Sequence, residues 1–172
     1  MHYKSLEIDG SLLLENDVYK DIRGVFTESF NANMRKVLKC DFIQDNIALS
    51  KKKYTFRGLH YQAKPYDQKK LIRVLKGEIF DILYDLRKKS PSYRKKLIIN
   101  LKDDFKQSLY IPNGVAHGYI TLVKDTIVTY KVDKKYSPKH EKGINLRDIN
   151  FDFEKVNLKY NKLVISDRDR SF

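Results

Sequence analysis

Residues 78–86 read Glu-Ile-Phe-Asp-Ile-Leu-Tyr-Asp-Leu, with a large apolar side chain at every second position. Successive side chains of a β-strand point to opposite faces, so this alternation predicts a strand with one strongly apolar face. The β-branched and aromatic residues of the stretch favour the same interpretation. The side chains on the apolar face are Phe80, Ile82, Tyr84 and Leu86.

The same pattern recurs on both sides of this stretch. In a predicted strand over residues 126–132, Val128, Tyr130 and Val132 share one face, and Lys131 lies on the other. Glycines and prolines stand at or near the strand ends, where turns need their backbone conformations. Strand and turn at short spacing predict an antiparallel sandwich or barrel. The other predicted strands are residues 70–75, 96–101 and 107–111.

Helices are few in the prediction. A short one is expected over residues 31–39, with Asn31 as its N-cap. From about residue 148, aromatic and aliphatic residues alternate with charges, which indicates short helices packed on the barrel. The chain has 172 residues, of which 41% are hydrophobic, and neither a linker nor an internal repeat interrupts it. We therefore expect a single domain over residues 1–172.

The composition limits the function classes. A formal net charge of +13 suggests nucleic-acid binding, but the lysines are scattered and no nucleic-acid-binding motif is present, which favours a solvated basic surface. A single cysteine, Cys40, excludes an internal disulfide framework and a cysteine-based zinc site. No apolar run long enough to span a membrane and no secretory signal are found, so a cytoplasmic protein is expected.

Two of the histidines follow turn residues and lead into predicted strands. His60 lies in Arg57-Gly-Leu-His-Tyr-Gln62, and His117 lies in Ile111-Pro-Asn-Gly-Val-Ala-His-Gly118. On the pattern alone, each is either a hydrogen-bonded barrel histidine or a functional group. A two-strand metal site would need His-x-His, a carboxylate and a further histidine, but position 62 is glutamine. The sequence therefore predicts no metal site, and it contains no P-loop or dinucleotide fingerprint.

The chain resembles the dTDP-4-dehydrorhamnose 3,5-epimerase family, a group of nucleotide-sugar epimerases. The two histidine segments are each fairly specific, and further segments match in the family's order over roughly residues 20–170. The resemblance implies a mostly β fold, a cupin-type antiparallel jelly-roll barrel or sandwich with a few short helices. The further segments are Arg23-Gly-Val-Phe-Thr-Glu-Ser-Phe30, Gln44-Asp-Asn46, Lys70-Leu-Ile-Arg73, Gly77-Glu-Ile-Phe-Asp81, Asp85-Leu-Arg87 with Ser90-Pro91, Tyr130-Lys131, Tyr136-Ser-Pro138 with Glu141, and Ser166-Asp-Arg-Asp169.

The resemblance also implies a reaction. The substrate would be a nucleoside-diphosphate 4-keto-6-deoxy sugar, whose ketone acidifies the C–H bonds at C3 and C5. His60 would be the base, Asp169 would orient it, and Tyr130 would be the acid on the opposite face. His117 and Lys70 would hold the enolate oxygen or the adjacent phosphate. The family's chemistry uses no cofactor and no metal, and its members imply a homodimer that shares strands across the interface.

Other residues match family positions that hold the nucleotide and the sugar. Arginine suits a diphosphate because its guanidinium donates paired hydrogen bonds, and Phe26 could stack on a base. The substrate-binding residues implied in this way are Arg23, Phe26, Glu28, Gln44, Asn46, Arg57, Lys70, His117, Tyr136 and Glu141.

The match departs from the family just before Ser137. The family commonly has two adjacent tyrosines there, the first associated with the nucleoside, whereas this chain has Lys135-Tyr136. A GDP-linked 4-keto sugar, including a keto-heptose, is therefore an alternative to a dTDP-linked one. A 3,4-ketoisomerase of the same fold and a non-catalytic sugar or nucleic-acid binder are further alternatives. The residues do not distinguish inversion at C3, at C5 or at both, and the expected role is in cell-surface polysaccharide biosynthesis.

Overall fold

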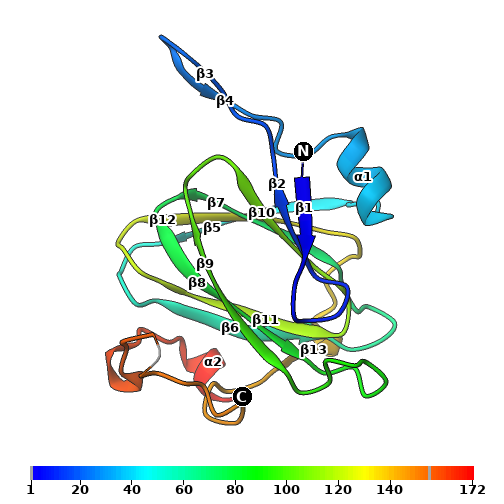
Figure 1. Ribbon diagram of the computed structural model, residues 1–172. Coiled ribbons are helices and arrows are strands. Elements are labelled where there is room, and N and C mark those ends of the chain that lie inside the picture. The colour runs from blue at the N-terminus through cyan, green and yellow to red at the C-terminus, as the bar shows by residue number, and fades with distance from the viewer. Residues whose placement is uncertain (1, 155) are drawn as a thin grey trace.

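The computed structural model describes residues 2–154 and 156–172, and two facing antiparallel sheets make up most of it (Figure 1). The arrangement is the sandwich that the alternating sequence predicts. The six-stranded sheet has the order β1 (His2–Ser5), β2 (Leu12–Glu15), β10 (Gln107–Ile111), β7 (Lys70–Lys76), β12 (Thr126–Val132) and β5 (Gln44–Ser50). The five-stranded sheet has the order β13 (Glu141–Gly143), β6 (Phe56–Gln62), β11 (Val115–Thr121), β8 (Glu78–Asp85) and β9 (Lys96–Lys102).

The pairing register places several polar side chains side by side. His60 on β6 is the register partner of His117 on β11, so the two histidine segments lie next to each other in one sheet. In the facing sheet, Tyr130 on β12 pairs with Asn46 on β5 and with Ile72 on β7. Residues far apart in the sequence are thus brought to two facing walls.

Strand β8 shows why the fold forms. Its odd positions, including Ile79 and Leu83, enter the core between the two sheets. Its even positions, including Ile82, lie under the C-terminal segment, which packs on the outer face of the five-stranded sheet. Both faces of this strand are therefore covered, and removal of apolar area from water stabilises the layers at about 25 cal/mol per Å². The residues of the C-terminal segment in this second cluster are Leu146, Ile149, Phe151, Leu158 and Leu163.

The short helices agree with the prediction. Helix α1 (Ala32–Leu38) begins after Asn31, whose side-chain oxygen accepts the Met34 N–H at 3.0 Å. The C-terminal segment contains η2 (Tyr160–Lys162) and α2 (Asp167–Arg170), and η1 (Pro138–His140) precedes β13. Among the helices of the described residues, α2 contributes Arg168 and Asp169 to the site described below.

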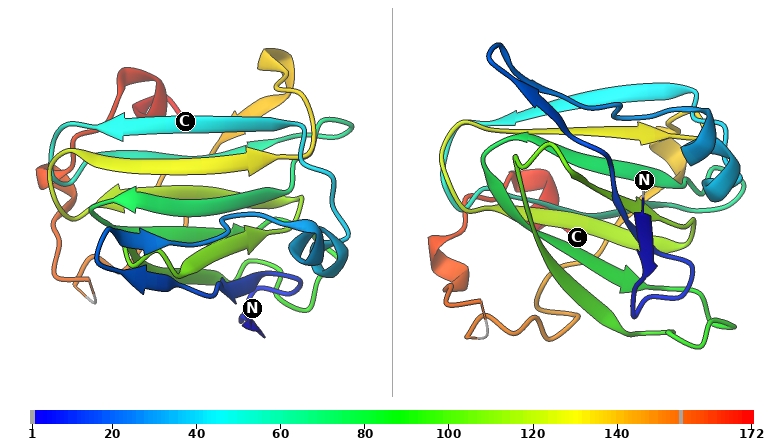
Figure 2. Two further views of the ribbon diagram at one scale, coloured as in Figure 1. Left: turned by 90° about the horizontal axis from the view of Figure 1, so that it is seen from above. Right: turned by 45° about the horizontal axis from the view of Figure 1, so that its top comes forward.

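A small hairpin stands away from the sandwich. Strands β3 (Tyr19–Asp21) and β4 (Gly24–Phe26) pair only with each other and project beyond the sheets in Figures 1 and 2. Ile22 at its turn is fully exposed, and Phe26 is largely exposed. Among the described residues, none of the helices is both long and apolar enough to cross a bilayer.

Candidate active site

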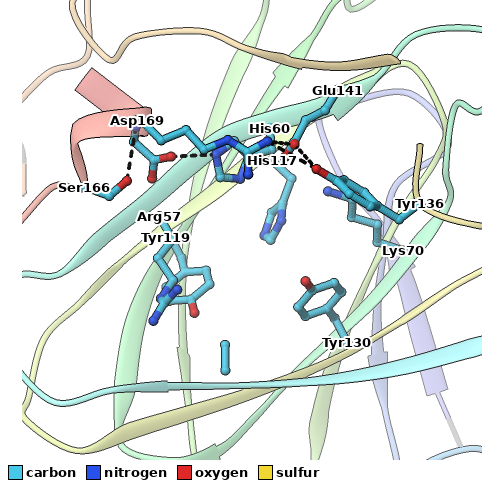
Figure 3. A pocket seen from close by; sticks show the side chains of 12 residues that line it. Arg57, His60, Lys70, His117, Tyr119, Tyr130, Tyr136, Glu141, Ser166 and Asp169 are labelled. Carbon is cyan, nitrogen blue, oxygen red and sulfur yellow. Dashed lines mark hydrogen bonds and ion pairs between the residues drawn. The ribbon is translucent and has the colours of Figure 1, made fainter. Parts of the chain in front are cut away.

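A pocket of about 480 Å³ lies between the two sheets and is bordered by α2 and β13 (Figure 3). This volume falls within the range of small-molecule sites. Eight of the predicted site residues meet in it, including all three of the predicted catalytic residues. These eight are Arg57, His60, Lys70, His117, Tyr130, Tyr136, Glu141 and Asp169.

The first feature of the pocket is a histidine–carboxylate pair. Nε2 of His60 lies 2.9 Å from Oδ1 of Asp169, and Oδ2 of Asp169 accepts the Gly58 N–H at 3.2 Å. The Ser166 hydroxyl caps α2 by accepting the Asp169 N–H at 3.1 Å. Burial acts to raise the pKa of Asp169, but His60 and the other donors outweigh it and lower that pKa. A carboxylate here holds the proton on Nε2, which leaves the Nδ1 lone pair of His60 free.

A second histidine pair lies at the buried end of the pocket. Nε2 of His117 is 2.9 Å from Oδ2 of Asp81 on β8, and both side chains are buried. Burial lowers the pKa of His117, although Asp81 acts in the opposite direction. Burial also lowers the pKa of Lys70, at the start of β7, to about 8, and the charge of Asp81 counteracts it. Lys70 is therefore mostly an ammonium at neutral pH, beside a histidine fixed by a carboxylate.

Tyr130 enters the pocket from the sheet that faces His60. Burial raises the pKa of Tyr130, and Arg57 partly counteracts this shift. The phenol thus keeps its proton at neutral pH. Arg57 on β6 donates through Nε to Ser50 Oγ at 3.1 Å and through Nη2 to the Leu49 carbonyl at 3.1 Å. These contacts tie Arg57 to the edge strand β5 at the rim of the pocket.

A third polar group joins α2 to the strand beside it. The Tyr136 hydroxyl donates a hydrogen bond to Glu141, and Arg168 forms an ion pair with the same carboxylate. Arg168 also donates to the Tyr136 hydroxyl at 3.2 Å. Because Arg168 precedes Asp169 in α2, these contacts attach the carboxylate partner of His60 to β13.

Three predicted binding residues lie outside this pocket. Arg23 and Phe26 are on the projecting hairpin, where Arg23 forms a two-point contact with Asp21. Glu28 follows the hairpin, is exposed and accepts a hydrogen bond from Asn31 at 2.6 Å. The hairpin leads away from the sandwich, so within this chain these side chains do not join the others.

Two more predicted residues lie beside the pocket without lining it. Asn46 donates to the Tyr130 carbonyl at 3.3 Å, and Gln44 donates to the Asn46 side chain at 2.7 Å. Both are on the face of β5 that includes Ala48, which does line the pocket. They continue the pocket wall along the edge strand.

Sequence reasoning missed several residues of the site. Ser166 and Arg168 belong to the same motif as Asp169, and a serine three residues before an acidic residue is a helix-capping signal that could have marked Ser166. Asp81 stands among apolar residues in a predicted strand, and such a buried charge indicates a fixed partner. Tyr119 and Ala48 gave no signal, since both fit an ordinary strand.

Across residues 2–154 and 156–172, three or more His, Cys, Asp or Glu side chains do not gather closely enough to hold a metal ion. The expectation that neither metal nor cofactor takes part stays a prediction. Cys40 is buried, and burial raises the pKa of its thiol to about 11.

Two facing sheets around a polar pocket place the chain among the cupin-type jelly rolls. Similarity to proteins of known sequence and structure places it among the isomerases. The chain belongs to the dTDP-4-dehydrorhamnose 3,5-epimerase family, whose sequence model matches residues 5–172. The fold class expected from the sequence is thereby confirmed.

Individual relatives are similar along nearly the whole chain. A dTDP-4-dehydrorhamnose 3,5-epimerase of Methanothermobacter thermautotrophicus is 38% identical over 168 residues, which are 96% of this chain and 89% of the relative. The crystal structure of the Bacillus anthracis enzyme with TDP and PPi bound has a TM-score of 0.86 and 39% identity, covering 98% of this chain and 97% of that one. A Legionella pneumophila 3,5-epimerase in complex with dTDP-4-keto-L-rhamnose has a TM-score of 0.89 and 32% identity, covering 99% and 90%.

Proposed function

We propose that this protein epimerises a dTDP-linked 4-keto-6-deoxy sugar at C3 and C5 and so supplies a sugar for cell-surface polysaccharides. The observation that carries the proposal is the pairing of His60 with Asp169 in a pocket that Tyr130 enters from the facing sheet. Family membership supports the choice of reaction, and the TDP and dTDP-sugar in two matched structures support the nucleotide.

His60 acts as the base in this mechanism. Its Nε2 proton is held by Asp169, so Nδ1 accepts the proton from the carbon next to the ketone. The imidazolium that forms is stabilised by the same carboxylate. General acid–base catalysis of this kind contributes about 10²–10⁴-fold to the rate.

The charge that develops on the ketone oxygen needs donors at the buried end of the pocket. Lys70 carries a positive charge below a pKa of about 8, and His117 lies beside it, held by Asp81. One such donor contributes about 10²–10³-fold by stabilising the enolate. Tyr130, which keeps its proton, returns a proton from the opposite wall and so inverts the carbon.

The pocket also suits an anionic substrate. Arg57 and Arg168 border it together with Lys70, and arginine binds diphosphate oxygens through paired hydrogen bonds. Tyr136 and Glu141 lie on the β13 side, where they would contact the nucleoside or the sugar. Gln44 and Asn46 extend this surface along β5.

The remaining three predicted residues enter the proposal through a homodimer. Arg23 and Phe26 project on a hairpin that is exposed in the single chain, and Glu28 follows it. Apolar side chains on β5, Ile47 and Leu49, are also exposed on the outer face of the six-stranded sheet. Burying these surfaces between two copies would take the hairpin of one protomer to the pocket of its partner.

The test of the reaction is proton NMR in D₂O with dTDP-4-keto-6-deoxyglucose as substrate. Deuterium should enter at C3 and C5, and the His60→Ala variant should incorporate none while staying folded. Absence of exchange with the dTDP-sugar, together with exchange in a GDP-linked 4-keto sugar, would move the assignment to the GDP-linked alternative. The matched relatives do not favour that alternative or the ketoisomerase.

Subunit complementation tests the dimer. His60→Ala and Arg23→Ala protomers should each be impaired alone, because one lacks the base and the other lacks a residue given to its partner. Random mixing makes half of the dimers mixed, each with one intact site, so about a quarter of wild-type activity should return. Activity that does not rise on mixing would contradict the shared site. That the enzyme works in the cytoplasm stays a prediction.

A further inference from the structure

The aromatic ring of Phe172 lies against the imidazole of His60. The ring centroids are 5.8 Å apart and the planes meet at 75°, an edge-to-face contact. Neither the histidine motifs nor the resemblance to the family assigned a role to Phe172. The contact joins the end of the α2 segment to the reacting group of the pocket.

Gly143 makes room for this contact. It is the register partner of His60 on β13, so a side chain there would stand beside the imidazole. A Cβ added to Gly143 would overlap the Phe172 ring. The backbone of Gly143 lies outside the left-handed region, so the space taken by Phe172, rather than the conformation, explains the glycine.

We propose that Phe172 is a positioning residue that holds the His60 ring in the orientation needed for proton abstraction. The inference rests on the proposed role of His60 as the base. Asp169 fixes Nε2, but one hydrogen bond still allows the imidazole plane to rock about that contact. The Phe172 ring limits this motion, because it packs against the imidazole from the space above Gly143.

Phe172 also keeps water away from the histidine–carboxylate pair. The Asp169 side chain is 7% exposed and that of His60 is 30% exposed, and both line the pocket. An apolar ring beside it lowers the local dielectric, which strengthens the hydrogen bond between the two groups. A substrate can then reach His60 while water does not compete for the hydrogen bond between His60 and Asp169.

One short segment supplies both contacts. Asp169 lies within α2, and Phe172 follows two residues after its last residue, Arg170. The segment is capped by Ser166 and attached to β13 through the Arg168–Glu141 ion pair. Movement of this segment would therefore loosen the hydrogen bond and the ring contact together.

The experiment compares Phe172→Ala and Gly143→Ala with a matched control, Phe153→Ala. Phe153 is an aromatic residue of the same C-terminal segment, but it packs on Phe151 and Tyr160 away from the pocket. In Phe172→Ala, kcat should fall about 10–100-fold with little change in KM, as expected for a misplaced reacting group. Gly143→Ala should behave in the same way, because its methyl group displaces the ring. Phe153→Ala should lose stability but keep its kcat.

A second readout does not depend on turnover. In ¹⁵N-edited proton NMR of the unliganded protein, the Nε2 proton of His60, assigned by its loss in His60→Ala, should exchange slowly with water. That exchange should accelerate at least about tenfold in Phe172→Ala and Gly143→Ala but not in Phe153→Ala. Wild-type exchange and kcat in Phe172→Ala would overturn the proposal. So would an equal change in Phe153→Ala. If wild-type protein turned over no 4-keto sugar, the proposed function would fail while the exchange measurement still decided the role of Phe172.

Discussion

Asp169→Asn is the change that tests the mechanism most directly. The two carboxylate oxygens of Asp169 have different partners: one lies 2.9 Å from His60 Nε2, and the other accepts the Gly58 N–H at 3.2 Å. An asparagine has one oxygen and one NH₂ group. If the oxygen keeps Gly58, the NH₂ group faces Nε2 and forces the imidazole proton onto Nδ1, the atom that must accept the substrate's proton.

The magnitude follows from the alternatives open to asparagine. Turning the oxygen to His60 restores the active tautomer but places two N–H donors against each other at Gly58, which costs about 1–3 kcal/mol. The imidazolium also loses a charge-assisted hydrogen bond, about 1.5–3 kcal/mol. Together these lower the rate by about 10²–10⁴-fold, the upper end matching the same substitution in a serine-protease triad.

The assay is the rate of deuterium entry at C3 and C5 under saturating substrate, with KM measured in the same series. We expect kcat to fall while KM changes little, since the side chain contacts His60 rather than the substrate. Circular dichroism and a melting curve control for folding. A variant with near wild-type kcat, or one with a raised KM alone, would refute the orienting role of Asp169.

Three further predictions concern other parts of the molecule. Tyr130→Phe should still exchange substrate protons with D₂O but form little inverted product; inversion at the wild-type rate would mean that another group is the acid. Burial lowers the pKa of Lys70 to about 8, so its charge is lost above that pH and kcat/KM should fall there. The Lys70→Met variant should have lower activity without this decline at alkaline pH. Asp85→Ala should lower the free energy of unfolding in urea by about 3–5 kcal/mol, because the buried carboxylate pairs with Arg87 and accepts two serine hydroxyls. A decrease under about 1 kcal/mol would contradict a stabilising role for this carboxylate.

The strands with regular alternation were predictable from the sequence. The prediction for residues 126–132 matches β12, and that for residues 107–111 matches β10. Apolar alternation succeeds here because one face of each strand packs into the core between the sheets. Strands β1 and β2 were not predicted, since each has four residues and depends on pairing with a neighbour rather than on its own pattern.

The site was predicted where motifs carried it. His60, Tyr130 and Asp169 were named from the family's segments, and the structure brings them into one pocket. Arg168 and Phe172 were not named, because their importance arises from contacts with Glu141 and with the His60 ring, which no local pattern records. Tertiary contacts between segments far apart in the chain decide such roles.

The separation of His60 and Asp169 by 109 residues in the sequence has a consequence for how activity arises during synthesis. In the part of the chain that the structure describes, the two sheets are complete by Gly143, so they can form before the α2 segment leaves the ribosome. A nascent or truncated chain that ends before Ser166 would have pocket walls, with Arg57 and Lys70 in place, but an unoriented base. Under the proposed function, such a chain would bind the nucleotide-sugar and leave it unchanged. In the proposed mechanism, proton abstraction therefore begins only after the α2 segment docks beside His60.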